Sequence, residues 1–144
     1  MARYITVVTT TEPPAEAFAY MARFSNAAEW DPGVTEAEAL TPGPPALGST
    51  YRLVVRFFGL STPIEYRIDE IDVPTRVVLQ GENAAVRSRD VIEVAPRQGG
   101  GSIVHYEANL ETKGVFVVLS PVLALAFRHV GDRAAQGLRR SLAP

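Results

Sequence analysis

The stretch SPVLALAFRHVGDRAAQGLRRSL, residues 120–142, decides the fold expected for this chain. Ser120 followed by Pro121 predicts the start of a helix, because the serine oxygen can cap a free amide and proline has no N–H to leave unsatisfied. At about 100° per residue, apolar side chains then share one stripe: Leu123, Phe127, Val130, Ala134 and Leu138. The first two turns are apolar all round. We therefore expect a long C-terminal helix that apolar elements cover on more than one side.

Most of the chain before this helix alternates apolar and polar residues, which is the pattern of half-buried strands. The first such run, residues 3–10, precedes two short helical segments at 15–24 and 27–30. Six more strands follow, separated by hairpin-length turns, at 36–40, 51–58, 64–69, 77–79, 87–94 and 104–111. The sequence Gly81-Glu82-Asn83 is expected to end the fifth strand.

The order of elements predicts the fold class. One buried face on a seven-stranded sheet is covered most economically when the sheet curls round a single long helix. We therefore expect one α+β domain over residues 1–144: a curved antiparallel sheet of seven strands around the C-terminal helix, with two short helices after the first strand.

Composition restricts the classes of function. With 144 residues, 47% hydrophobic and 21% charged, and a net charge of −2, the chain has no basic surface suited to nucleic acid. It contains no cysteine, which excludes disulfides and thiol nucleophiles. His105 and His129 lie far apart without ligand-spaced carboxylates, so we expect no metal and no other cofactor. No stretch approaches about 18 apolar residues, which predicts no membrane span. We expect a cytoplasmic monomer or homodimer.

A curled sheet has more apolar wall than one helix can fill, and the remaining space predicts a cavity for a small hydrophobic ligand. Alternation places Tyr51, Tyr66 and Tyr106 on the inner face, where their hydroxyls suit a partly oxygenated ligand. The other expected pocket residues are Trp30, near the entrance, and Leu53, Val55, Ile68, Ile92, Leu123, Phe127 and Val130.

Asp90 is the candidate for chemistry. It shares a strand face with Ile92 and Val94, and apolar surroundings disfavour the charged form of a carboxylate, so Asp90 could act as a general acid or base. It could equally accept a hydrogen bond from a pocket tyrosine, or lie near a strand end in water. We interpret it as the polar anchor of the pocket and as the candidate catalytic residue.

The order of elements and five segments carry a family resemblance. The segments are Phe24–Val34 (FSNAAEWDPGV), Gly48–Ser49, Ile68–Pro74 (IDEIDVP), Gly100–Ser102 and Lys113–Gly114. Together they resemble the START-like (SRPBCC) superfamily, and within it the bacterial polyketide cyclase/dehydrase and lipid-transport group. The resemblance implies a helix-grip fold. It leaves the function open, because the superfamily includes aromatase/cyclases, carriers of lipids and other hydrophobic ligands, and chaperone activators.

Two parts of the expected site, Trp30 and the strand at residues 64–71, can be compared with the family pattern. Trp30 matches the tryptophan that follows the first helix in the family and lies near the pocket mouth. Aromatase/cyclases carry tryptophans, a serine and an arginine that face the pocket from the strand corresponding to residues 64–71. Here the side expected to face inward has Tyr66, Ile68 and Glu70, so that constellation does not carry over.

Three functions remain open on the sequence. The leading one is binding of a small hydrophobic, partly oxygenated ligand, such as a polyketide, lipid or aromatic compound, between the C-terminal helix and the sheet. The second is an enzyme of polyketide cyclase/dehydrase type, in which Asp90 and pocket tyrosines move protons. The third is an interaction protein with a filled core that meets its partner at the apolar start of the last helix.

Overall fold

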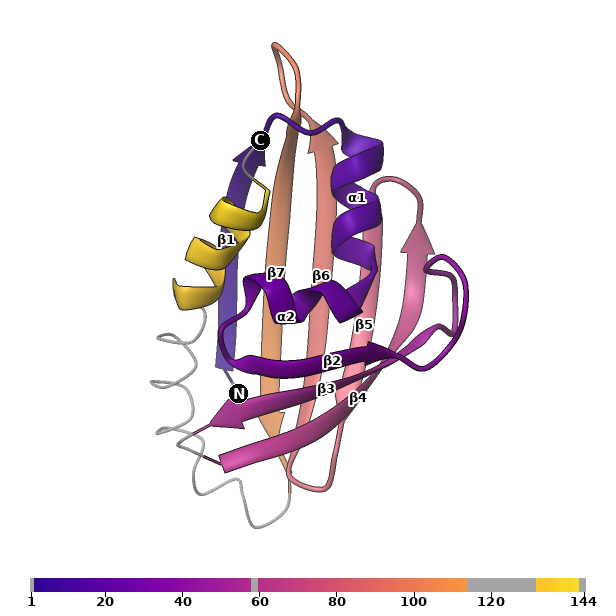
Figure 1. Ribbon diagram of the computed structural model, residues 1–144, viewed down its shortest axis with the longest axis vertical. Coiled ribbons are helices and arrows are strands. Elements are labelled where there is room, and N and C mark those ends of the chain that lie inside the picture. The colour runs from indigo at the N-terminus through magenta and orange to yellow at the C-terminus, as the bar shows by residue number, and fades with distance from the viewer. Residues whose placement is uncertain (1, 58–59, 114–131, 143–144) are drawn as a thin grey trace.

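The computed structural model describes residues 2–57, 60–113 and 132–142, and within them seven strands form one antiparallel sheet (Figure 1). The strands lie in the order β1-β7-β6-β5-β4-β3-β2. Their bounds are β1 Ala2–Thr10, β2 Val34–Ala39, β3 Thr50–Phe57, β4 Leu60–Asp72, β5 Arg76–Glu82, β6 Val86–Pro96 and β7 Ser102–Thr112. The helical segments are α1 (Pro14–Ala22), the 3-10 turn η1 (Phe24–Asn26), α2 (Ala27–Trp30) and residues 132–141. The predicted α+β architecture is confirmed.

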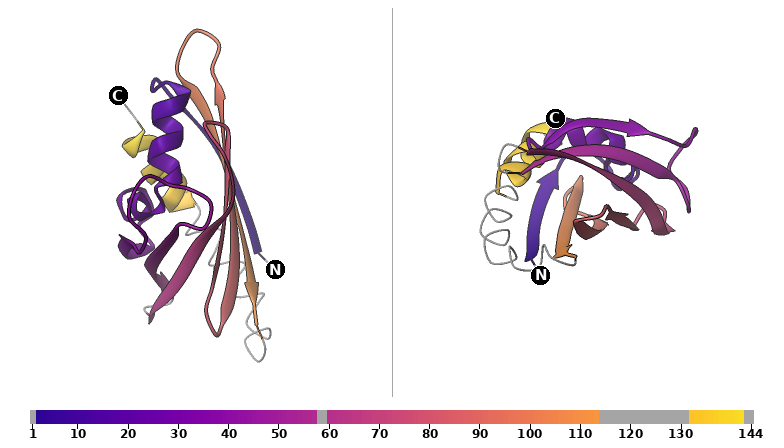
Figure 2. Two further views of the ribbon diagram at one scale, coloured as in Figure 1. Left: turned by 90° about the vertical axis from the view of Figure 1, so that its right-hand side faces the viewer. Right: turned by 90° about the horizontal axis from the view of Figure 1, so that it is seen from below.

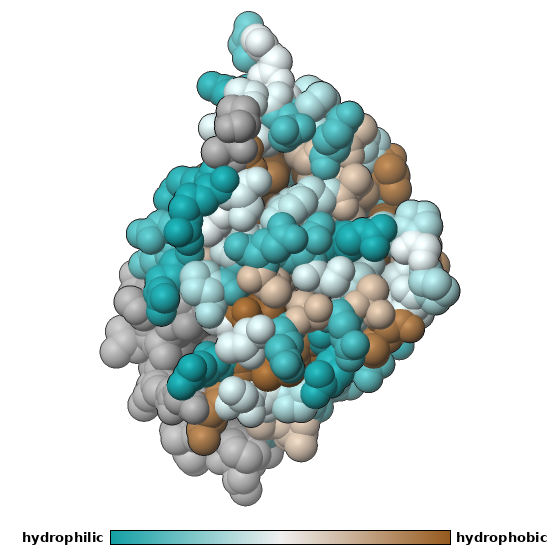
Figure 3. Space-filling model, in the orientation of Figure 1, coloured by the Kyte–Doolittle hydropathy of each residue, from teal (hydrophilic) through white to brown (hydrophobic). Residues whose placement is uncertain are grey.

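The described helices all lie on one face of the sheet, and the sheet curls around that face (Figure 2). Alternation explains the burial, because successive strand residues point to opposite faces. The inward Leu79, Ile92 and Val104 are 0% exposed, and Phe18 and Met21 of α1 are buried against the same core. On the helix-bearing side, polar residues predominate and apolar ones form separate patches (Figure 3). The apolar core therefore lies between the sheet and its helical cover.

The end of the C-terminal helix is held closely against the rest of the fold. Leu138 is fully buried, and the Thr10 hydroxyl donates a hydrogen bond to the Leu142 carbonyl, which joins the helix end to β1. Gly137 faces α2, where a Cβ at this position would overlap the carbonyl oxygen of Trp30. Glycine therefore lets the two helical backbones approach each other.

Two strands depart from the predicted alternation. A bulge shifts the β4–β5 register between Ile68 and Glu70. Glu70, predicted to face the pocket, is therefore exposed and forms an ion pair with Arg76 at 3.4 Å. Strand β5 continues through Gly81 and Glu82, where it was expected to end. Gly81 lies opposite Tyr66, and a Cβ there would come within 2.6 Å of the Tyr66 ring, so glycine makes room for that ring.

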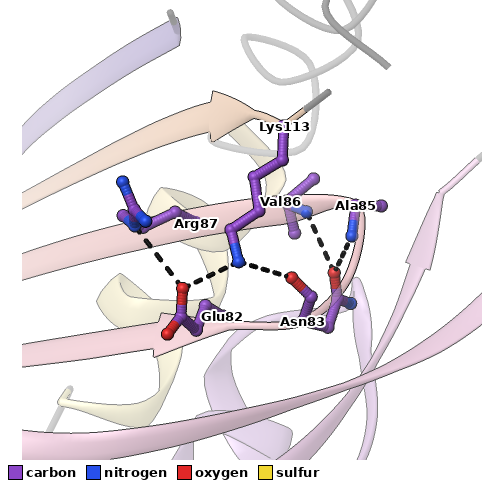
Figure 4. A network of polar contacts seen from close by, with 6 residues as sticks. All are labelled: Glu82, Asn83, Ala85, Val86, Arg87 and Lys113. Carbon is purple, nitrogen blue, oxygen red and sulfur yellow. Dashed lines mark hydrogen bonds and ion pairs between the residues drawn. The ribbon is translucent and has the colours of Figure 1, made fainter. Parts of the chain in front are cut away.

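The turn between β5 and β6 is tied to the end of β7 (Figure 4). The Asn83 Oδ1 accepts the backbone N–H groups of Ala85 at 2.8 Å and Val86 at 2.9 Å, which closes the turn. Lys113 Nζ donates to the Asn83 carbonyl at 2.9 Å and lies 2.8 Å from Glu82 Oε2. Lys113, the residue that follows β7, is therefore fixed against the β5–β6 turn.

Candidate functional site

A cavity of about 50 Å³, lined mostly by buried residues, lies between the inner face of the sheet and the η1–α2 segment. Its described lining residues are Phe24, Ala27, Trp30, Asp31, Val34, Leu53, Val55, Ile64, Tyr66, Ser88, Asp90, Tyr106, Ala108 and Leu110. Hollows on the outer sheet face measure about 210 and 200 Å³, but they are open and lined largely by arginine and glutamate side chains. The inner cavity, with a mostly apolar wall and a few converging polar groups, is therefore the candidate site.

The cavity volume limits what can enter. Sites for drug-sized molecules typically measure roughly 300–1,000 Å³, so the 50 Å³ seen here admits only a few non-hydrogen atoms. A larger ligand would have to extend beyond the cavity or displace part of its wall.

Asp90 is the centre of a buried polar cluster. Its carboxyl accepts a hydrogen bond from the Tyr106 hydroxyl at 2.7 Å on Oδ2 and one from the Ser88 hydroxyl at 2.8 Å on Oδ1. Ser88 and Asp90 share a face of β6, and Tyr106 lies on the adjacent β7. Asp90 is 3% exposed, and this burial raises its pKa to about 6 although both hydrogen bonds lower it. The group therefore titrates close to neutral pH.

A second carboxyl, that of Asp31, lines the same cavity from the end of α2. The Gly33 amide donates to its Oδ1 at 2.9 Å. Burial raises the pKa of Asp31 to about 6. The hydrogen bond from Gly33 and the positive charge of Arg133 lower this pKa, and the negative charge of Asp90 raises it further. Two carboxyl groups with raised pKa values therefore line one cavity, and the charge of Asp90 acts on Asp31.

Aromatic rings line the same cavity as these carboxyl groups. The Trp30 and Tyr106 rings meet edge to face at a centroid distance of 5.3 Å, and Phe24 meets Tyr66 in the same way at 4.9 Å. Burial, and then the charge of Asp90, raise the pKa values of Tyr66 and Tyr106 well above 10. Both phenols therefore keep their protons at neutral pH, and the packed rings hold them in place.

The structure brings together half of the pocket residues expected from the sequence. The ones that line the cavity are Trp30, Leu53, Val55, Tyr66, Asp90 and Tyr106. Tyr51, Ile68 and Ile92 are buried in the core but are not part of this lining. Leu123, Phe127 and Val130 lie outside the described residues. Trp30, placed near the entrance from the sequence, is 1% exposed and forms an inner wall instead.

Some lining residues were missed from the sequence. Ser88, Ile64 and Ala108 line the cavity. Each lies two positions from a predicted site residue on the same strand, so the two-residue period of a strand could have identified all three. Asp31 carried no such signal. An aspartate before Pro-Gly reads as a turn residue, and nothing local shows that the turn faces β6.

Neither a metal site nor a membrane-spanning helix is found in the described part of the chain. Its His, Asp and Glu side chains form no group of three or more that could hold a metal ion. None of its helices combines the length and apolar character needed to cross a bilayer.

Solved structures share this architecture. A START superfamily protein from Mycobacterium smegmatis matches with a TM-score of 0.79 and 13% identity, over 99% of this chain and 97% of that one. The Zhui aromatase/cyclase from Streptomyces matches with a TM-score of 0.79 and 12% identity, over 97% and 92%. A Thermus thermophilus protein gives a TM-score of 0.72 at 14% identity, over 98% and 95%. The chain therefore shares the helix-grip-like α+β fold of these structures.

The sequence itself places the chain in a family. The model of the polyketide cyclase/dehydrase and lipid transport family matches residues 1–143. The chain belongs to this family. Among curated proteins, no sequence match is found.

Proposed function

We propose that this protein binds a small, mostly apolar and partly oxygenated molecule, such as a polyketide, lipid or aromatic compound, whose polar end enters the cavity. One observation carries the proposal: the Ser88–Asp90–Tyr106 cluster is buried in the wall of a largely apolar cavity between the sheet and the η1–α2 segment. Burying a carboxyl costs folding free energy, so a role in ligand binding explains the position of Asp90 better than a role in stability does. The family description supports the same class of ligand.

The hydrogen-bonding capacity of Asp90 is consistent with this role. An ionised carboxylate offers about four acceptor positions, and the bonds from Tyr106 and Ser88 occupy two. A ligand can therefore bind Asp90 without breaking either bond.

Two measurements test the proposal. Native mass spectrometry of freshly purified protein should show a co-purifying hydrophobic compound. The neutral probe N-phenyl-1-naphthylamine should quench the fluorescence of Trp30, which is the only tryptophan and lines the cavity. Ala108→Leu should abolish both signals because it fills the cavity, whereas Ala95→Leu, at an exposed position, should not. Absence of both signals in the parent protein would refute the proposal.

A second function, proton transfer of cyclase/dehydrase type, is favoured by the state of Asp90. With a pKa of about 6, Asp90 is mostly ionised at neutral pH and can take a proton from carbon next to a carbonyl. This predicts that the protein accelerates solvent deuterium exchange into benzoylacetone, followed by NMR. Asp90→Asn should lose the acceleration and keep probe binding. A parent rate equal to the buffer rate would rule out this chemistry for that diketone.

A further inference from the structure

The cavity offers an incoming polar group more hydrogen-bond acceptors than donors. Ionised carboxylates only accept. The Tyr106 and Ser88 hydroxyls already donate to Asp90, and Asp31 has one oxygen engaged by the Gly33 amide. The Tyr66 hydroxyl also lines the cavity and can donate, but the remaining carboxylate positions only accept, so a ligand that binds the carboxylates has to supply protons.

The charges around the cavity favour the same kind of ligand. Asp31 and Asp90 line it, and its described lining includes no lysine, arginine or histidine. From the described part of the C-terminal helix, residues 132–142, the charge of Arg133 acts on Asp31. Asp90 is faced by Asp31, by Tyr66 of β4 and Tyr106 of β7, and by the serine on its own strand. No described base neutralises Asp90, so the cavity has negative charge available for a cation.

We propose that the polar end of the ligand is a protonated amine, held between Asp31 and Asp90, and that the cavity rejects carboxylates. This assignment rests on the proposed function and names the ligand class for the same cavity. The rings of Phe24, Trp30 and Tyr106 meet edge to face in its wall, and aromatic faces attract cations. A carboxylate would instead bring a third negative charge into a buried site, which is strongly unfavourable.

A matched series of probes tests the assignment: 2-phenylethylamine, 2-phenylethanol and phenylacetate, each titrated at about pH 7.5 with Trp30 fluorescence and calorimetry. Charge-assisted hydrogen bonds exceed neutral ones by about 1.4 kcal/mol, so the amine should bind about tenfold more tightly than the alcohol. The acid should show no measurable binding. Between about pH 5 and pH 8 the affinity for the amine should rise up to about tenfold as the carboxyls ionise, while the affinity for the alcohol should stay nearly constant.

Variants locate the effect in the two carboxyls. Asp90→Asn and Asp31→Asn should each reduce the preference for the amine, and the double variant should lose both the preference and its pH dependence. Asp69→Asn, at an exposed position on β4, is the matched control and should behave like the parent. Circular dichroism checks folding. Asp31→Asn changes a partly exposed turn residue, so it keeps the test available if Asp90→Asn does not fold.

The outcomes separate this assignment from the proposed function. If phenylacetate binds as tightly as the amine, or if the double variant keeps the preference for the amine, the assignment is wrong while ligand binding stands. If none of the three probes binds, the assignment is also wrong, and the co-purification experiment decides independently whether the cavity binds other hydrophobic molecules.

Discussion

Replacing Asp90 by asparagine is expected to stabilise the protein at neutral pH and to change its stability much less in acid. Burial raises the pKa of Asp90 from 3.8 to about 6, so the folded state binds this proton more tightly than the unfolded state does. The resulting stabilisation is complete below about pH 3.8 and is lost as the pH rises through about 6. At about 1.4 kcal/mol per pKa unit, ionised Asp90 costs the folded state about 3 kcal/mol. Asparagine avoids that cost because it has no charge to bury.

Urea unfolding at about pH 4.5 and about pH 8, followed by far-UV circular dichroism, measures the effect. Relative to the parent, the free energy of unfolding of Asp90→Asn should rise by about 2 kcal/mol between these values, since part of the cost is already present at the lower pH. Asp69→Asn, whose carboxylate pairs with Arg67 on the outer surface at 2.8 Å, should show a much smaller rise. A difference between Asp90→Asn and the parent that stays constant with pH would refute the reasoning.

Three further substitutions test the packing and hydrogen bonds of the fold and of the site. Gly137→Ala should destabilise the fold by about 1–3 kcal/mol despite the better helix propensity of alanine, because its Cβ overlaps the Trp30 carbonyl; a raised melting temperature would contradict this packing. Asn83→Ala leaves two turn amides without their acceptor and should lower the free energy of unfolding by about 2 kcal/mol, whereas an unchanged urea midpoint would show that the turn does not depend on it. Tyr106→Phe removes a bond that lowers the pKa of Asp90, so NMR titration should find this pKa above about 6; an unchanged value would argue against that bond.

Alternation along most of the strands predicted which of their residues face the core. Tyr66, Asp90 and Tyr106 are buried where the two-residue period places them. It failed at Glu70, because a bulge adds a residue to one strand and reverses the facing beyond it. It also could not separate cavity residues from filled core, since Tyr51 and Ile92 share the inner face but are not part of the cavity lining.

The sequence by itself determined the order of elements, the two faces of most strands and the place of Asp90 on an inner face, because each of these depends on the periodicity of neighbouring residues. The tertiary structure alone decided that Asp31 shares a cavity with Asp90 and that this cavity measures about 50 Å³. It also decided that Trp30 is buried and that its backbone packs against Gly137. These features depend on how a short helix and the C-terminal helix are set against a curved sheet. No local sequence pattern encodes how these segments are placed relative to one another, because the segments that line the cavity are far apart in the chain.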